Sequence, residues 1–393
     1  MSNDKVKKIL GNAFMDIATA IETGNFGSKA KVGLTTYGSE HGPENLIKGA
    51  EMAAKRLSDV EIVLIGAPCE TALRVVEVAS EEDAHKKMEE MLDNGDLDSC
   101  VTMHYSFPIG VSTVGRVSTP ALGKEMIIAT TTGTSATNRT EAMIKNAIYG
   151  IVAAKSIGIE EPTVGILNVD NARTVERALK ELDKKGFPIN FGESGRADGG
   201  SVMRGNDLLM GSCDVMVTDT LTGNILMKMF SSFNTGGSYE ATGCGYGPGI
   251  GFDYDRTVLI LSRASGSPVV ANAIGYAADL AKGNVKAVAK HELDLVKAVG
   301  LDDVINDLVR ESHNKVCTEE VVAPPKEVVT GTISGIDIMD LEDACQVLWA
   351  KGIYAESGMG CTGPIVMVSE ANVEAAMAEL ADKGYVSKEA TPC

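Results

Sequence analysis

Basic residues are scarce in this 393-residue chain. It has 36 lysines and arginines against 54 aspartates and glutamates, which gives a formal net charge of −18 at pH 7. A surface this acidic repels the phosphates of nucleic acids and the headgroups of anionic lipids, and the sequence shows no basic patch. We therefore expect neither a nucleic-acid-binding protein nor a membrane-surface protein.

Long apolar runs are absent as well. No segment approaches the ~18 consecutive apolar residues that a membrane-spanning helix requires. Near the N-terminus, apolar residues recur at helical spacing and are interrupted by Asp16 and Glu22, which favours an amphipathic helix over a signal peptide. We expect no membrane segment and a cytoplasmic protein.

Paired cysteines are missing too. The eight cysteines are scattered along the chain, and no two of them form a CxxC pair. In a reducing compartment we expect free thiols rather than disulfides or zinc ligands. The sequence therefore predicts no metal site, and we expect no cofactor in this chain.

The sequence does contain an alternation of short β-rich runs and longer helical segments. Strands are expected at 31–36, 61–65, 99–103, 126–131, 163–169, 189–193, 215–219 and 257–261, and helices at 43–57, 86–92, 139–157 and 173–185. Short strands separated by helices are typical of parallel strands with crossover helices. The sequence predicts an α/β fold with a mainly parallel sheet flanked by helices.

The pattern changes after Ala323-Pro324-Pro325, where two prolines end the helical stretch 285–310. Beyond them we expect strands at 328–334, 354–357 and 365–368, a turn at 358–364, and helices at 340–351 and 370–383. We predict three parts: an N-terminal helical segment (1–30), an α/β core (31–325) and a small α+β domain (326–393).

The turn Ser357-Gly-Met-Gly-Cys361-Thr-Gly-Pro364 places a cysteine among glycines. Glycines leave the thiol uncrowded and let backbone N–H groups point at a small anion. A thiolate forms thioesters readily, and it needs nearby positive charge or N–H donors to ionise below its usual pKa of ~8.5. Cys361 is therefore a candidate nucleophile. The alternative is a small residue in a glycine-rich hairpin.

Two other turns follow predicted strands and precede helices, where open α/β sheets place ligand sites. In the turn from Asp219 to Asn224, the helix N-terminus at Thr222 and Gly223 favours phosphate or carboxylate, although a plain Asx turn with an N-cap is the alternative. In the other turn, Ser262-Arg263 offers phosphate a hydroxyl and a planar fork of donors. The alternative there is a surface arginine capped by serines.

Four more residues are candidates. Cys100 and His104 form the nearest cysteine–histidine pair in the sequence, although Cys100 also suits a core position. His41 lies in the turn after the first strand. Cys244 lies in Gly236–Gly251, which holds too many glycines for a regular element and is expected to be a mobile loop over a site.

These motifs occur in an order that resembles the phosphate acyltransferase and phosphotransacetylase superfamily. Gly38-Ser-Glu-His-Gly-Pro43 is similar to the glycine-rich start of acyl-phosphate-forming acyltransferases, and 158–168, 189–196 and 214–228 are similar to their later blocks. Ser262-Arg263 resembles the phosphate-binding Ser-Arg turn of phosphotransacetylases. The resemblance covers residues 31–285 and implies a two-lobed core, of the phosphotransacetylase and isocitrate dehydrogenase type, that forms acyl phosphates.

With the tail Gly360-Cys361-Thr-Gly-Pro364, nearly the whole chain resembles the component C alpha subunits of glycine, sarcosine and betaine reductase complexes. That resemblance implies an acetyl thioester on Cys361, formed from a carboxymethyl group on a selenocysteine of component A and released by inorganic phosphate as acetyl phosphate. It also implies two partners, selenoprotein component A and a condensing-enzyme-like beta subunit, in a homodimer or hetero-oligomer. Either glycine-rich backbone or Asn224 is expected to stabilise the tetrahedral oxyanion.

The chain departs from the phosphotransacetylase pattern at one place, and the difference bears on the acyl donor. Phosphotransacetylases carry an aspartate a few residues after the Ser-Arg turn, where this chain has Val269 and Val270. A protein-bound acyl donor has no coenzyme A thiol to deprotonate, which agrees with the component C interpretation. Two alternatives stay open: a stand-alone phosphate acyltransferase that uses acyl-coenzyme A or acyl carrier protein, and a non-catalytic scaffold for a partner subunit.

Overall fold

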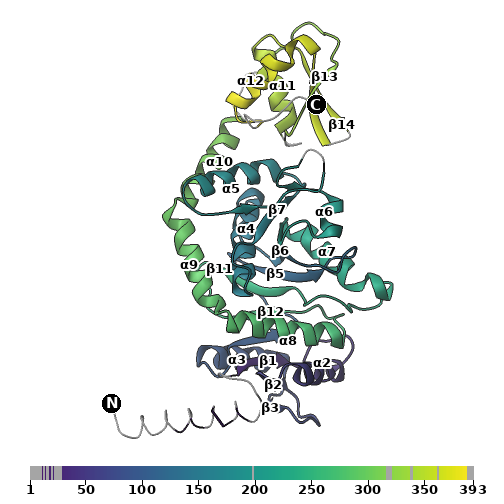
Figure 1. The fold of residues 1–393 in the computed structure, drawn as a ribbon, viewed down its shortest axis with the longest axis vertical. Coiled ribbons are helices and arrows are strands. Elements are labelled where there is room, and N and C mark those ends of the chain that lie inside the picture. The colour runs from purple at the N-terminus through teal and green to yellow at the C-terminus, as the bar shows by residue number, and fades with distance from the viewer. Residues whose placement is uncertain are drawn as a thin grey trace. The chain divides into compact units, whose positions relative to one another are not determined.

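The fold is taken from a computed structural model of the chain (Figure 1). It describes residues 29–196, 199–315, 321–336, 340–360 and 363–386, together with Gly11, Phe14, Ile17, Ala18 and Ile21. Most of the expected N-terminal helical segment therefore lies outside the described residues.

The chain forms two compact units. Unit 1 comprises Met1–Gly165, Asn190–Gly195 and Gly205–Asp294, and unit 2 comprises Ile166–Ile189, Arg196–Arg204 and Leu295–Cys393. The division into 1–30, 31–325 and 326–393 stays a prediction.

Most of unit 1 is built on one large sheet with the strand order β3-β2-β1-β4-β12-β11-β5-β6-β10-β7-β8, in which β9 (Val202–Met203) also pairs with β7. The strands are β1 (Ala30–Thr35), β2 (Val60–Gly66), β3 (Arg74–Glu77), β4 (Ser99–Thr102), β5 (Val111–Ser118), β6 (Glu125–Gly133), β7 (Thr163–Leu167), β8 (Asn190–Phe191), β10 (Val215–Val217), β11 (Gly247–Gly251) and β12 (Val258–Ile260). Parallel pairs predominate, for example β1 with β2 and β4, whereas β5 pairs antiparallel with β6 and β11. The predicted α/β class with a mainly parallel sheet is confirmed.

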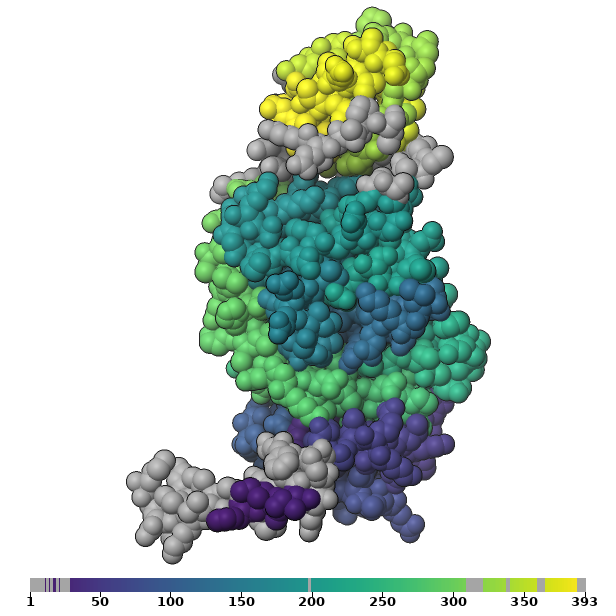
Figure 2. Space-filling view, viewed as in Figure 1, coloured from purple at the N-terminus to yellow at the C-terminus, as the bar shows by residue number. Residues whose placement is uncertain are grey.

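Helices flank this sheet. They are α2 (Pro43–Arg56), α3 (Glu81–Asp93), α4 (Arg139–Ser156), α6 (Gly205–Met210), α7 (Thr220–Ser232), η1 (Phe233–Thr235), α8 (Ser267–Lys282) and α9 (Val285–Ala298). Helix α8 packs against α2, far away in sequence, as its green atoms beside the purple ones show (Figure 2). Gly49 permits this approach, because a Cβ there would lie 2.6 Å from the Cβ of Val270.

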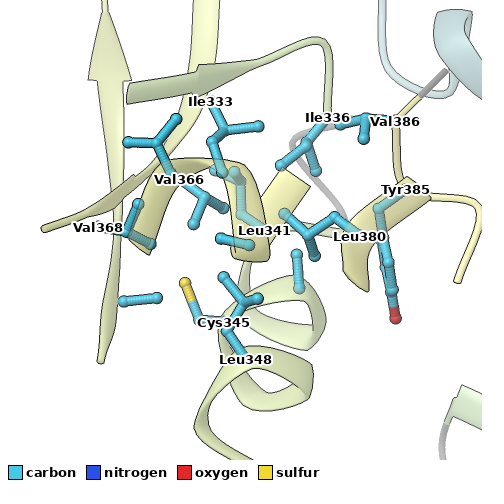
Figure 3. Close-up of a cluster of buried hydrophobic side chains, with 14 residues drawn as sticks. Ile333, Ile336, Leu341, Cys345, Leu348, Val366, Val368, Leu380, Tyr385 and Val386 are labelled. Atoms are coloured by element: carbon cyan, nitrogen blue, oxygen red, sulfur yellow. The ribbon is translucent and has the colours of Figure 1, made fainter. Parts of the chain in front are cut away.

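Unit 2 contains a second, smaller sheet with the order β13-β15-β14. Its elements are α5 (Ala172–Lys184), β9 (Val202–Met203), α10 (Leu301–Lys315), β13 (Gly331–Ser334), α11 (Leu341–Ala350), β14 (Ala355–Gly360), β15 (Gly363–Val368), η3 (Glu370–Asn372) and α12 (Val373–Asp382). The antiparallel sheet and the two helices α11 and α12 enclose an apolar core that includes Val366, Leu348 and Leu380 (Figure 3).

Strands β14 and β15 extend further than the sequence predicted. Their pairing runs from Ala355 with Val368 to Gly360 with Gly363, so most of the expected turn at 358–364 is strand. Cys361 and Thr362 lie between these strands in the sequence and outside the described residues.

The glycine-rich segment Gly236–Gly251 was predicted to be a mobile loop, and for its last five residues that prediction is wrong. They form β11, which lies between β12 and β5 in the middle of the sheet. Glycine is needed there for close packing rather than for mobility, since a Cβ at Gly249 would meet the Phe107 ring at 2.3 Å. The position of a residue within a sheet cannot be read from local composition.

Candidate phosphate site

Three parallel strands of unit 1 end at the same edge of the sheet. β1 pairs in parallel with β4, and β4 with β12, so the segments that follow them emerge side by side. Glu40 follows β1, His104 follows β4 and Ser262 follows β12. β11 begins where the antiparallel β12 ends, which brings Tyr246 to this edge as well. The carboxyl ends of parallel strands are where α/β sheets place ligands.

The turn after β12 is held by its own hydrogen bonds and by the turn after β1. The backbone N–H of Ala264 donates to Ser262 Oγ at 3.2 Å, and that of Glu40 donates to the Arg263 carbonyl at 3.0 Å. The ring of His41 is exposed, with Nε2 3.3 Å from the Ala264 carbonyl oxygen. His41 thus lies beside the predicted phosphate turn.

Helix α7 contributes two side chains, Asn224 and Lys228, which lie one helical turn apart. Asn224 Nδ2 donates to the Thr131 carbonyl at 3.0 Å. Lys228 Nζ lies 5.6 Å from the centre of the Tyr246 ring, within the range of a cation–π contact. Asn224 is therefore held by a residue of β6, and Lys228 rests on the residue that precedes β11.

These segments line an open pocket of about 300 Å³. It is lined by Glu40, Met103, His104, Thr132, Asn224, Lys228, Tyr246, Ile260, Leu261, Ser262 and Arg263. Arg263 and Lys228 give the lining two positive charges, and Glu40 gives it one negative charge. A guanidinium, an ammonium group and a hydroxyl are the side chains that proteins commonly use to hold phosphate.

The lining includes four residues that the sequence had singled out: His104, Asn224, Ser262 and Arg263. Sequence reasoning missed Lys228 and Tyr246. The signal for Lys228 was its position four residues after Asn224 on one predicted helix. Tyr246 gave no signal, because it reaches the pocket through the pairing of β11.

Asp219, Thr222 and Gly223 are not among the lining residues of this pocket. Asp219 is the N-cap of α7: it accepts from the Thr222 backbone N–H at 3.1 Å and from the Thr222 hydroxyl at 2.6 Å, and it pairs with Arg139 at 3.1 Å. Burial by itself raises the pKa of Asp219, but the bonds from Thr222 and the charge of Arg139 outweigh it, so the pKa is lowered. Gly223 packs against Thr130, where a Cβ would lie 1.8 Å from the carbonyl oxygen.

The candidate thiols have different surroundings. Cys100 is fully buried, and burial raises the pKa of its thiol far above the usual range. Burial also raises the pKa of Cys244 to about 12, against the opposing charge of Arg116. Both thiols are therefore protonated near neutral pH and are poor nucleophiles. Cys361 lies outside the described residues.

In the described part of the chain, no helix is long and apolar enough to cross a bilayer. The same part contains no group of three or more histidine, cysteine, aspartate or glutamate residues that could hold a metal ion.

Comparisons with known proteins identify the family. A family model described as "Fatty acid synthesis protein" matches residues 30–367. The component C subunit alpha of the glycine/sarcosine/betaine reductase complex from Peptoclostridium acidaminophilum is 68% identical over 382 residues, which cover 97% of this chain and 99% of that protein. The chain belongs to the component C alpha subunit family. The resemblance inferred from the tail around Cys361 and from the core motifs is confirmed.

Weaker similarities extend to phosphate acyltransferases and to a solved structure. A phosphate acyltransferase from Lysinibacillus sphaericus is 27% identical over 235 residues, covering 50% of this chain and 70% of that protein. Among solved structures, a branched-chain phosphotransacylase from Enterococcus faecalis is similar with a TM-score of 0.44 and 16% identity, covering 64% of this chain and 99% of that chain.

Proposed function

We propose that this chain transfers an acetyl group from a protein-bound thioester to inorganic phosphate and so forms acetyl phosphate. The observation that carries the proposal is the pocket in which Ser262, Arg263 and Lys228 meet at the carboxyl ends of parallel strands. The match to the component C alpha subunit and to phosphate acyltransferases supports the reaction class.

The two cations of the pocket give phosphate a charge-complementary site. The Arg263 guanidinium can donate two parallel hydrogen bonds to phosphate oxygens, and Lys228 adds a point charge. Neutralising the phosphate dianion lets one of its oxygens approach a carbonyl carbon to about 3–3.5 Å, the distance from which reaction occurs.

The chemical step breaks one bond and makes one. A phosphate oxygen attacks the thioester carbon, a C–O bond forms and the C–S bond breaks. The departing thiolate takes the proton that monohydrogen phosphate brought. No atom changes oxidation state in this step, so it requires no reductant or oxidant. Asn224 uses one N–H of its amide on Thr131, which leaves the other to stabilise the tetrahedral oxyanion.

We assign the thioester to Cys361 because of the motif Gly360-Cys361-Thr-Gly, in which glycines flank the thiol. The high pKa of Cys100 and Cys244 makes these two thiols poor alternatives. In this proposal the acetyl group derives from the carboxymethyl group that a selenocysteine of component A carries. The C–Se bond breaks, the methylene carbon gains two electrons and becomes a methyl group, and component A supplies these electrons and is left oxidised. The carboxyl group forms the thioester with the Cys361 thiol and releases water.

The proposal includes partner subunits, as the designation "alpha" of the reductase relative suggests. Helix α7 and the residue after it carry a row of large apolar side chains spaced four residues apart and more than half exposed: Leu221, Ile225, Met229 and Phe233. A row of this kind is unfavourable in water and commonly marks a protein interface. We assign it to the beta subunit.

Phosphate binding by the isolated chain, measured by calorimetry, tests the proposal. The wild-type chain is expected to bind phosphate, and Arg263→Ala is expected to weaken binding about 10- to 100-fold, the worth of a hydrogen bond to a charged group. Arg74→Ala removes the same charge from an exposed site on β3 and is expected to leave the affinity for phosphate unchanged. Equal losses in both variants would mean a general charge effect and would contradict a site at Arg263.

The same preparation separates the alternatives. Acetyl phosphate formed by the isolated chain from acetyl-coenzyme A and phosphate would favour the stand-alone acyltransferase. The scaffold alternative would be favoured if the wild-type chain bound no phosphate but the assembled complex still required the chain for activity.

A further inference from the structure

Glu240 is a buried carboxylate next to the pocket. It does not line the pocket itself, but it forms a hydrogen bond with Tyr246, which does. Its side chain is 3% exposed. Tyr246 donates its hydroxyl to Oε1 at 3.0 Å, and Ser265 donates its hydroxyl to Oε2 at 2.8 Å. A carboxylate is costly to bury unless hydrogen bonds compensate for the lost water, so these two hydroxyls stabilise Glu240 where it lies.

The backbone of Glu240 is bonded to the same turn. Its N–H donates to the Ala264 carbonyl at 3.0 Å, and its own carbonyl accepts from the Gly266 N–H at 2.8 Å. Glu240 and Ser265 also form an isolated parallel bridge. The phosphate-binding turn is therefore held to Glu240 through both backbone and side chain.

On the other side, Glu240 connects to the wall of the pocket. Tyr246 lines the pocket, and its ring lies under Lys228. One carboxylate thus contacts both the segment that carries Ser262 and Arg263 and the aromatic ring against which Lys228 rests.

We propose that Glu240 is a positioning residue of the phosphate site: by accepting from Tyr246 and Ser265 at once, it fixes the turn that carries Arg263 relative to the Tyr246 ring against which Lys228 rests. Donors that are already held in place lose little freedom when an anion binds, which strengthens binding without any direct contact from Glu240. The inference deepens the proposed function and rests on it.

Calorimetry with inorganic phosphate tests this role in the full chain. In Glu240→Gln the amide offers one acceptor oxygen and one NH₂ group, so one of the two hydroxyls loses its acceptor. We expect the dissociation constant for phosphate to rise about tenfold, the scale on which second-layer hydrogen-bond partners act at other sites. Glu292→Gln is the matched control, because Glu292 is also buried but pairs with Lys155. It is expected to bind phosphate like the wild type.

A double-mutant cycle separates positioning from general stability. Glu240→Gln and Ser265→Ala are each expected to weaken phosphate binding, and the double variant is expected to be little worse than either, because both remove the same link. All titrations are made at a temperature where thermal unfolding shows every variant folded.

The outcomes are distinct. If Glu240→Gln only lowers the melting temperature and binds phosphate with wild-type affinity, Glu240 is structural and the inference is overturned. If the loss of phosphate affinity in the double variant equals the sum of the two single losses, the inference is also overturned. Additive losses would mean that Glu240 and Ser265 act independently and not through one shared hydrogen bond. A wild-type chain that binds no phosphate would overturn the proposed function, and this inference with it.

Discussion

The ammonium nitrogen of Lys228 lies 5.6 Å from the centre of the Tyr246 ring, at the wall of a pocket that also contains Arg263. The contact places the lysine charge beside the turn that follows β12. Two cations from distant parts of the sequence, one on a helix and one on a loop, thereby face one small volume. This relationship is what makes the pocket suited to a doubly charged anion.

Lys228→Gln is expected to weaken phosphate binding about tenfold at low salt, because it removes one charge-assisted contact. The loss should shrink at high salt, where an exposed charge is screened. Calorimetry at two salt concentrations measures both effects. Lys290→Gln, on α9, removes another exposed lysine charge and should not change the affinity for phosphate. An unchanged affinity in Lys228→Gln would exclude this lysine from the site.

Cys361→Ala is expected to abolish covalent labelling of the chain by its acetyl donor. Cys244→Ala should label like the wild type, because burial raises the pKa of that thiol to about 12 and leaves almost no thiolate at neutral pH. Peptide mass spectrometry locates the acetyl group. Labelling that persists in Cys361→Ala would show that another thiol is the carrier.

Asp219→Ala is expected to lower the free energy of unfolding by about 1 kcal/mol, the typical worth of an N-cap. The pKa of Asp219 is lowered in the folded chain, so its charged form stabilises the fold above the unfolded-state pKa of about 3.9. That contribution is lost as the pH falls through the folded-state pKa. Urea unfolding at pH 7 and at acidic pH measures this effect. The difference in free energy of unfolding between the wild type and Asp219→Ala should be smaller at acidic pH.

Asp219→Asn is the matched control, because its side-chain oxygen can still accept from the Thr222 backbone N–H. It should retain most of the stability, and neither variant should lose phosphate affinity as Arg263→Ala does. A loss of that size in Asp219→Asn would give the carboxylate a direct role in the site.

The apolar row on α7 is expected to be needed for assembly. Leu221→Asp with Met229→Asp should prevent association with the purified beta subunit, because two carboxylates would be buried at the interface. Ile109→Asp places a carboxylate at another exposed apolar position, 77% exposed, and should assemble normally. Light scattering of the mixed subunits measures the complex. Normal assembly of the double variant would show that the beta subunit binds elsewhere.

Much of the fold could be predicted because its signals are local. The run Glu61–Ile65 reads as a buried strand and lies within β2, and the helix expected at 139–157 corresponds to α4. Strand β5 was missed, since Val111–Ser118 mixes small and polar residues and is identified as a strand only by its antiparallel neighbours.

The site could be predicted only in part. Ser262 and Arg263 follow a recognisable strand and precede a helix, so their position at a sheet edge was foreseeable. Tyr246 and Glu240 could not be found in this way, because they reach the site through the pairing of β11 and of residue 240 with the turn after β12. Which strands pair, and in which register, depends on the whole fold and cannot be read from the residues around Tyr246 or Glu240.

Phosphorolysis of the acetylated chain tests the central claim most directly. Chain carrying an acetyl group on Cys361 is mixed with phosphate labelled with ¹⁸O, and both the protein mass and the released product are measured. The account predicts that the acetyl mass disappears only when phosphate is present and that ¹⁸O-labelled acetyl phosphate appears in equal amount, with Arg263→Ala requiring more phosphate. Release of free acetate instead, or retention of the acetyl group at high phosphate, would contradict it.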